Sequence, residues 1–304
     1  TITYQATFQG NNVTDASFGL FGHVTGTIKN LNVNGEATIS GNGSDMQIGL
    51  LCGKLANSQT ETSSGNRPVN YSYTYKMGNI SHCSVSGNVT STVYASNGGG
   101  TDAGLIVGQC EGTVEYCMGT GNVIGVGYVG GLVGQMKKQN NYQCSITGCA
   151  FIGNVTAEDP TSTSGDDVGS FAGGICGYAG NNTTIEQCYA SGTITSNKAA
   201  SGIVSTQING GGNVNVDNSY ADVTLVGRET NTATNDITNG NNGNNDNNYD
   251  SDDLNGKTLE QIYAILDALN GSDNNGDAHF EYIGGQIVLV LGKVCESPTG
   301  LTYT

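Results

Sequence analysis

Gly131-Leu132-Val133-Gly134 is the stretch that decides the fold, because five similar phrases occur elsewhere in the chain. Those copies begin at Gly19, Leu50, Leu105, Gly174 and Gly202. Each copy is followed by a second phrase, apolar-x-x-Cys in four copies, such as Ile146 to Cys149, and then by a third phrase of the type Gly153-Asn-Val-Thr156. Repetition of this kind predicts one supersecondary unit stacked on copies of itself.

The apolar stretches within each unit are short and are bounded by Gly, Asn, Ser or Thr, which is typical of β-strands. The 48 glycines argue against helices, since each glycine inside a helix costs roughly 1 kcal/mol. Three short strands per unit predict one coil of a parallel solenoid, and stacked coils bury the apolar columns that a single coil exposes. We therefore predict an all-β fold, a parallel β-solenoid (β-helix) of about six coils with a small α+β cap at its C-terminal end.

Four cysteines share one column of the repeat, in which the first unit has Leu31 and the last unit has Ser219. They are Cys83, Cys117, Cys149 and Cys188. A column that accepts leucine is a core column, so these thiols are predicted to be small buried hydrophobes. Stacking in register makes their side chains parallel, which is a poor geometry for a disulfide. Cys110 and Cys144 lie outside the columns in neighbouring coils, and whether they are bridged stays open.

The third phrase predicts two more columns, an apolar one and a threonine-rich one that follows it. The apolar column is predicted to contain Ile39, Val89, Val123, Val155, Ile194 and Val223. The next column is predicted to contain Ser40, Thr90, Ile124, Thr156, Thr195 and Thr224. Because Ser40 and Ile124 interrupt the threonines, we interpret this column as a structural ladder and not as a regular ice-binding array.

The copies of the first phrase are unevenly spaced, which predicts loops that protrude from the rod. If a binding face exists, we expect it on these insertions, chiefly Asn66–Met77 and Glu158–Asp167. Tyr71, Tyr73 and Tyr75 alternate in the first insertion and predict a small accessory strand or hairpin. Tyrosine combines an apolar face with a polar tip, so these three are the candidate binding residues. The alternative is that they pack the loop against the rod.

The C-terminal part reads as a cap. Thr258 and Gln261 form a capping-box pattern at the start of a short helix. One face of this helix is predicted to consist of Leu259, Ile262, Leu266 and Leu269, and the next segment reads as a hairpin around Gly284-Gly285. Such a cap is expected to cover the open last coil. The predicted division is a solenoid over 1–226, an Asn/Asp-rich loop over 227–257, a helix-plus-hairpin cap over 258–295, and the start of a linker or next module over 296–304.

Charge and composition exclude several classes of partner. The net charge is −16, from 26 acidic and 10 basic residues, and such a surface repels nucleic acid and anionic membranes. No stretch approaches the roughly 18 apolar residues of a membrane span. We therefore expect no nucleic-acid partner and no membrane span in this chain.

Catalytic and metal-binding patterns are weak. The three histidines are far apart, and none belongs to the His-Glu-x-x-His pattern of zinc peptidases. Asp166-Asp167 is the one adjacent acidic pair directly before a coil, but its Ser/Thr/Gly context favours a solvated loop over an acid/base pair. Asp273 to Asp277 carries oxygen ligands without the spacing of an EF-hand and reads as a surface turn. We predict no catalytic residue, no metal site and no cofactor.

The three phrases together resemble the GLUG repeat over roughly residues 18–226, most closely at Gly131–Gly134 with Ile146–Gly153 and at Gly174–Gly177 with Ile185–Gly192. The last unit departs from the pattern, with Ser205 in place of glycine. Proteins with this repeat are similar in being bacterial, large and exported. They include adhesin-like surface proteins of gut Bacteroidetes and non-catalytic regions of immunoglobulin A-specific metallopeptidases. The resemblance implies a location and an architecture, and it transfers no catalytic residue.

We therefore expect a non-enzymatic module of an exported bacterial cell-surface protein, with an adhesion, ligand-binding or spacer role. The expected location is extracellular or at the bacterial cell surface. The partner would be a host or microbial glycan or a protein, between which the sequence does not decide. The alternative is a carbohydrate-active β-helix enzyme with acidic residues in a groove.

Overall fold

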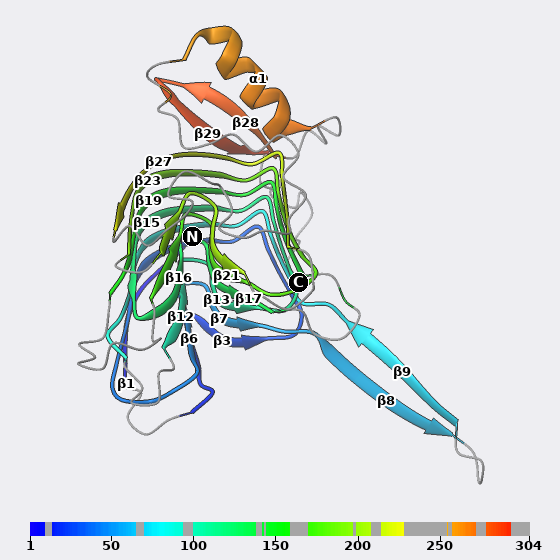
Figure 1. Ribbon diagram of the computed structural model, residues 1–304. Coiled ribbons are helices and arrows are strands. Elements are labelled where there is room, and N and C mark those ends of the chain that lie inside the picture. The colour runs from blue at the N-terminus through cyan, green and yellow to red at the C-terminus, as the bar shows by residue number, and fades with distance from the viewer. Residues whose placement is uncertain are drawn as a thin grey trace, which may run out of the picture.

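The computed structural model describes residues 1–9, 14–64, 70–93, 100–137, 142, 144–158, 170–196, 199–207, 214–227, 254, 257–271 and 278–292. These residues form a parallel β-solenoid with a small helix-and-hairpin cap (Figure 1), which confirms the predicted fold class. Most of the predicted Asn/Asp-rich loop, the terminal module start and the second insertion lie outside the described residues. The division into domains stays a prediction.

Each of the six coils contains four strands, so the prediction of three was wrong. The first phrase explains the difference, because its leading pair of residues forms a sharp bend between two strands. In the fourth coil, Gly131 and Leu132 form this bend between β16 (Gly127–Gly130) and β17 (Val133–Met136). The phrase therefore spans a corner of the coil and does not form a single strand.

The strands follow one another coil by coil. The first three coils consist of β2 (Ser17–Phe18), β3 (Phe21–Val24), β4 (Thr27–Lys29) and β5 (Asn32–Ser40); β6 (Met46–Gly49), β7 (Cys52–Leu55), β10 (Asn79–Ser81) and β11 (Ser84–Ser91); and β12 (Thr101–Gly104), β13 (Val107–Cys110), β14 (Thr113–Glu115) and β15 (Met118–Gly125). The last three consist of β16, β17, β18 (Cys144–Thr147) and β19 (Ala150–Ala157); β20 (Phe171–Gly173), β21 (Cys176–Ala179), β22 (Thr183–Glu186) and β23 (Tyr189–Ser196); and β24 (Ala199–Ser201), β25 (Val204–Gln207), β26 (Val214–Asp217) and β27 (Tyr220–Gly227).

Equivalent strands stack into four parallel sheets, which we number I to IV in the order in which the chain visits them. Sheet I is β2-β6-β12-β16-β20-β24, sheet II is β3-β7-β13-β17-β21-β25, and sheet III is β4-β10-β14-β18-β22-β26. Sheet IV is β1-β5-β11-β15-β19-β23-β27, in which the opening strand β1 (Ile2–Gln9) pairs with β5 of the first coil. The hydrophobic core lies between the sheets and continues from coil to coil.

The pairing register confirms the columns of the first two phrases. Val133 lies between Val107 and Cys176, and Ile146 lies between Val114 and Ile185. The third phrase was misaligned by two residues at both ends of the repeat. Val89 pairs with Ala37 and not with Ile39, and Ile194 pairs with Leu225 and not with Val223. The threonine column accordingly contains Thr38 in the first coil and Val226 in the last.

The cysteine column is stacked and buried as predicted. The backbone N–H of Cys83 donates to Sγ of Cys117 at 3.4 Å, and that of Cys117 donates to Sγ of Cys149 at 3.3 Å. All eight cysteines in the described part of the chain are free thiols, Cys110 and Cys144 included. Cys144 instead donates from Sγ to the carbonyl of Cys110 at 3.2 Å. Burial raises the pKa of Cys52 to about 12, so that core thiol stays protonated and unreactive.

One glycine column lets the long strands of sheet IV approach one another. Gly121 has φ of 143° and stacks on Gly87 and Gly153 in the neighbouring coils. A Cβ atom added to Gly121 would lie 1.7 Å from the carbonyl oxygen of Gly87. Only glycine combines this backbone angle with this close contact.

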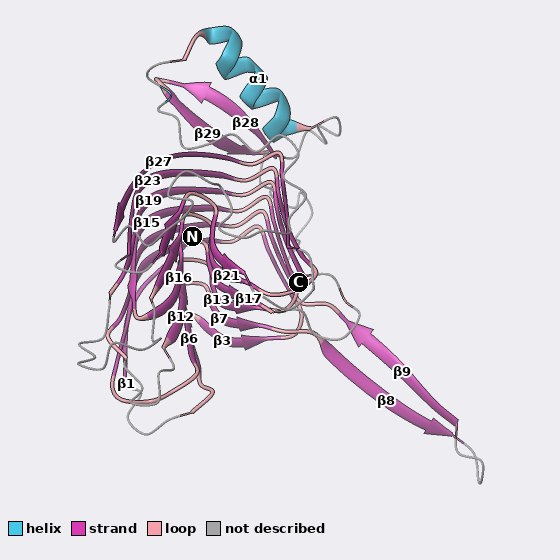
Figure 2. Ribbon diagram, viewed as in Figure 1, coloured by secondary structure: helices cyan, strands magenta, loops and turns pink. Residues whose placement is uncertain are grey.

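The cap consists of α1 (Leu259–Asn270) and the antiparallel hairpin β28 (Ala278–Ile283)–β29 (Gln286–Leu291), and α1 is the only helix among the elements described (Figure 2). The predicted capping box is present, because Gln261 N–H donates to Thr258 Oγ1 and Thr258 N–H donates to Gln261 Oε1. The predicted buried face was wrong at one position. Leu259 is 62% exposed in the first turn, and Ile265 is buried in its place.

The sequence predicted a cap that covers the open last coil, and the described hairpin does not pair with that coil. β27 is the terminal strand of sheet IV, and the hairpin forms a separate sheet. The cap packs instead on the outer side of sheet IV, where Ala150, Tyr189 and Tyr220 of three successive coils lie beneath it. The buried cluster at this contact comprises Ala150, Tyr189, Tyr220, Leu254, Ile262, Ile265, Leu266, Leu269, Phe280, Ile287 and Leu289.

Candidate binding surfaces

The first insertion forms the predicted hairpin, with β8 (Ser58–Ser64) antiparallel to β9 (Asn70–Lys76), and it projects away from the coils (Figure 1). Asn57 holds its base closed. Its side-chain amide donates to the carbonyl of Glu111 at 2.8 Å, and its Oδ1 accepts from the N–H of Gly78 at 3.0 Å. The two ends of the hairpin are thereby fixed to each other and to the third coil.

The candidate tyrosines lie on β9, and the structure places them by their backbone. Tyr71, Tyr73 and Tyr75 are paired with Ser63, Glu61 and Gln59 of β8, respectively. Their side chains lie outside what the structure describes, so their binding role stays a prediction.

A second surface lies in the outer corner between sheets I and II, which sequence reasoning missed. Figure 1 shows β6, β12 and β16 of sheet I at a steep angle to β7, β13 and β17 of sheet II, so that the coil has an L-shaped bend. Two ladders of side chains meet there, and we call them the corner ladders. The sheet I ladder is Ser17, Gln47, Asp102, Tyr128 and Phe171, and the sheet II ladder is Lys54, Gln109, Gln135 and Tyr178.

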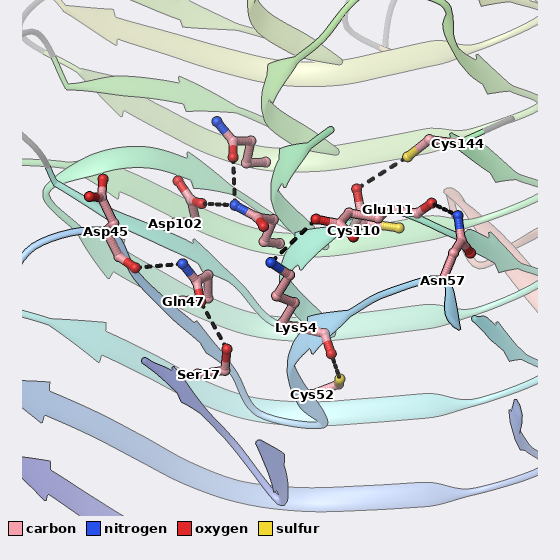
Figure 3. Close-up of polar contacts among 12 residues, drawn as sticks. Ser17, Asp45, Gln47, Cys52, Lys54, Asn57, Asp102, Cys110, Glu111 and Cys144 are labelled. Carbon is pink, nitrogen blue, oxygen red and sulfur yellow. Dashed lines mark hydrogen bonds and ion pairs between the residues drawn. The ribbon is translucent and has the colours of Figure 1, made fainter. Parts of the chain in front are cut away.

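The part of the corner in the first coils is polar (Figure 3). Gln109 donates from Nε2 to Oδ2 of Asp102 at 3.1 Å and to Oε1 of Gln135 at 2.8 Å. Ser17 donates to Oε1 of Gln47 at 2.8 Å. Burial raises the pKa of Asp102 to about 7, although the hydrogen bond from Gln109 acts in the opposite direction. A carboxyl group with this pKa can exchange a proton at neutral pH.

The part of the corner in the fourth and fifth coils is aromatic. The ring of Tyr128 lies 4.5 Å from that of Tyr178 and is stacked at 5.7 Å on that of Phe171, measured between centroids. All three rings are half-buried. Burial, and then the nearby carboxyl of Asp102, raise the pKa of Tyr128. The corner thus offers ring faces on two coils and amide or carboxyl groups on the preceding ones.

One largely buried ion pair involves Lys54 of the sheet II ladder. Nζ of Lys54 lies 3.3 Å from Oε1 of Glu111, with the two side chains 19% and 6% exposed. The second oxygen of Glu111, Oε2, is buried and has no hydrogen-bond partner in the described part of the chain. Lys54 is therefore the group that compensates this buried carboxylate.

We expect the stability of the protein to respond to Asp102 in one pH range. The folded-state pKa of about 7 lies above the value of roughly 3.9 for an unfolded aspartate, so the folded protein binds this proton more tightly. Stability from this group is therefore full below pH about 4 and falls as pH rises toward 7. Asp102→Asn can still accept from Gln109 but carries no charge, and we expect it to be up to about 4 kcal/mol more stable than wild type at pH 8, which is the pKa difference of about three at 1.36 kcal/mol each.

Thermal unfolding at pH 4 and at pH 8 checks this result, with the two proteins expected to match at pH 4. Gln47→Glu is a matched comparison, because it places a new carboxyl on the same ladder. An equal gain for Asp102→Asn at both pH values would contradict the assignment.

A cavity of about 280 Å³ lies between the cap and the bend from sheet III to sheet IV. Coils three to six contribute one residue each to this wall from the column that precedes the cysteines. These four residues, Tyr116, Gly148, Gln187 and Asn218, all have positive φ, because the chain turns sharply there. The remaining lining consists of Glu186, Leu269, Asn270, Gly271, Ala278, His279, Phe280 and Leu289.

The described residues form no cluster of three or more His, Cys, Asp or Glu side chains that could hold a metal ion. Among the same residues, no helix has the length and apolar character needed to cross a membrane.

These observations define a repeat protein with a parallel β-solenoid fold. The chain contains a GLUG motif, because the family model described as "The GLUG motif" matches residues 170–195. The matched residues span β20 to β22 of the fifth coil and all but the last residue of β23, and the other coils share this register, so the predicted resemblance is confirmed. The motif is typical of extracellular bacterial proteins.

A comparison with curated proteins finds no match. Among solved structures, the chain is similar to a putative immunoglobulin A1 protease from Bacteroides ovatus. The TM-score is 0.46 at 17% sequence identity, over 94% of this chain and 86% of that one.

Proposed function

We propose that this chain is a non-enzymatic, adhesive or ligand-binding module of an exported bacterial cell-surface protein. The observation that carries the proposal is the β8–β9 hairpin, which a stack of coils holds away from its own surface (Figure 1). The coils supply rigidity, since each strand is paired on both sides in the middle of the stack. A projecting two-stranded element on such a support is suited to contact with a partner, because loops on rigid scaffolds carry binding functions.

The chemistry of β9 favours a glycan or a protein surface as the partner. Tyr71, Tyr73 and Tyr75 occupy alternate positions, and tyrosine stacks on sugar rings or packs on apolar protein surface while its hydroxyl stays hydrated. The net charge of −16 disfavours anionic partners such as nucleic acid.

Removal of the hairpin should abolish binding and leave the solenoid folded. We expect this of a variant in which two glycines replace residues 58–76, because Asn57 and Gly78 are already hydrogen-bonded across the cut. Its melting temperature should stay within a few degrees of wild type, since the hairpin lies outside the coil core. Binding is measured on a glycan array and on immobilised epithelial cells.

The triple variant Tyr71→Ser, Tyr73→Ser and Tyr75→Ser separates the side chains from the backbone of the hairpin. Loss of binding in both variants would support a binding role for the three tyrosine side chains. Loss of binding in the deletion alone would support a binding role for the hairpin that does not depend on these side chains. Unchanged binding by the deletion would remove the proposal.

A second candidate function, a carbohydrate-active enzyme, rests on Asp102. A carboxyl group with a pKa of about 7 is suited to general acid catalysis, and Tyr128 beside it offers a ring face for a sugar. Release of reducing ends from a panel of polysaccharides tests this candidate. Turnover that disappears in Asp102→Asn would establish it, and turnover of any polysaccharide would overturn the non-enzymatic proposal.

A further inference from the structure

The cavity under the cap is built by the repeat itself. In the left-handed corner column, Tyr116 and Gly148 are neighbours on adjacent coils, and a Cβ atom on Gly148 would lie 2.6 Å from Cδ1 of the tyrosine. Glycine at this position therefore allows the tyrosine ring to lie across the next coil. The ring becomes part of the cavity wall, together with Gln187 and Asn218 of the fifth and sixth coils.

The polar groups of the wall are available for a ligand. The side chains of Glu186, Gln187 and Asn218 make no hydrogen bond or ion pair within the part of the chain that the structure describes. By contrast, Asn270 is fully engaged, since its amide donates to the carbonyl of Phe280 at 3.0 Å and its Oδ1 accepts from the N–H of Phe280 at 2.6 Å. These two bonds join α1 to β28 within the cap, while the coil wall keeps a carboxylate and two amides without a partner among the described residues.

The charges of the wall select the class of ligand. The lining contains no lysine or arginine, and its histidine, His279, is paired with Glu281 at 2.6 Å. The C-terminal end of α1 also faces the cavity and has no basic residue in its last turn. Helix C-termini carry partial negative charge, so this end and Glu186 both disfavour an anion.

We propose that this cavity binds one neutral sugar ring, such as the terminal residue of a glycan. The carboxylate of Glu186 accepts hydrogen bonds from hydroxyl groups, and the amides of Gln187 and Asn218 both donate and accept, as a polyol requires. The face of Tyr116 supplies the apolar surface on which a sugar ring packs. A volume of about 280 Å³ admits a single ring and excludes a longer chain from the interior.

This site is separate from the function proposed above. It is formed by coils three to six and the cap, whereas the hairpin leaves the second coil between β7 and β10. Loss of hairpin-dependent adhesion therefore leaves the sugar site untouched, and the reverse also holds.

Ligand-observed saturation-transfer NMR on the full chain tests the site. The probes are free D-galactose, D-glucose and N-acetyl-D-glucosamine, with the anionic N-acetylneuraminic acid as the opposing probe. We expect transfer to at least one neutral sugar and none to the anionic one. Glu186→Ala should weaken the binding about tenfold, the effect of losing a hydrogen bond to a charged group.

The controls distinguish a loss of sugar binding at the cavity from a loss of folding and from an effect of a charge elsewhere. Glu260→Ala removes an acidic residue from the first turn of α1, outside the cavity, and should bind as wild type does. Thermal melts must show that Glu186→Ala is folded; where it is not, Glu186→Gln serves, with a smaller weakening expected because the amide oxygen still accepts a hydrogen bond but carries no charge. The hairpin deletion should retain sugar binding. Absence of transfer to every neutral sugar, preference for the anionic sugar, unchanged binding by a folded Glu186 variant, or loss of binding in the hairpin deletion would each overturn the proposal.

Discussion

Gly121→Ala is expected to disrupt the middle of the solenoid, at a cost of more than about 4 kcal/mol, the range reached only by severe backbone strain or core damage. The glycine has φ of 143°, and the added Cβ would lie 1.7 Å from the carbonyl oxygen of Gly87. The third coil must then move away from the second. Because each coil contacts mainly its neighbours, the separated parts should unfold in different transitions. Chemical denaturation followed by circular dichroism measures both effects.

Gly26→Ala is the matched control for this substitution. No atom lies within 4 Å of the Cβ that alanine would add at Gly26, and its backbone has no positive φ. We expect its stability to stay within about 0.5 kcal/mol of wild type. A Gly121→Ala protein that melts like the Gly26→Ala protein would show that sheet IV tolerates wider spacing than the structure indicates.

Lys54→Met is expected to destabilise the protein by about 3 kcal/mol at pH 7, because it leaves Glu111 buried without its cation. The two charges are 3.3 Å apart, and Glu111 is 6% exposed. Urea denaturation at pH 7 measures the loss.

The double variant Lys54→Met with Glu111→Gln isolates the interaction. Removing both charges avoids an unpaired buried carboxylate, so the double variant should be more stable than Lys54→Met alone at pH 7. Equal stability of the single and double variants would mean that water or another group compensates Glu111.

The sequence predicts the solenoid well where a column repeats one type of residue. Val133 and Cys149 each belong to a phrase that recurs at every coil, and both columns are in the predicted register. The predicted register of the third phrase was wrong in the first and last coils. There the apolar residue was chosen by its similarity to the other copies and not by its separation from the preceding phrase. Counting six residues onward from Leu31 and Ser219, as from Cys83, selects Ala37 and Leu225, the residues that the pairing shows.

The corner ladders could not be predicted in the same way, because their residue types change from coil to coil. Asp102, Tyr128 and Gln47 occupy equivalent positions, yet they share neither charge nor shape. The signal available was position alone, two residues before the glycine that ends the sheet I strand, Gly104 in β12 and Gly130 in β16. The cavity under the cap could not be predicted for a different reason. It exists only because the cap packs on the solenoid at this place, and the sequence does not show where the cap packs.

The cap also has one feature that the local sequence predicts and one that depends on tertiary contacts. Thr258 and Gln261 are three residues apart, so the capping box is a local property that the sequence predicts. The exposure of Leu259 depends on which side of α1 meets sheet IV, and that contact involves Tyr189 and Tyr220 from distant coils. The spacing of apolar residues predicts which side of a helix is apolar, but it does not predict the surface against which that side packs.

The position of the hairpin has a mechanical consequence. A partner that pulls on β8 and β9 transmits tension into the second coil between β7 and β10, not into either end of the rod. From there to the last coil, the load crosses successive coil interfaces whose hydrogen bonds are directed from one coil to the next, so a pull along the stack acts along them and not across them. Under such a pull the interfaces act in series. The tension that the rod withstands is then that of its weakest interface, however many coils are stacked.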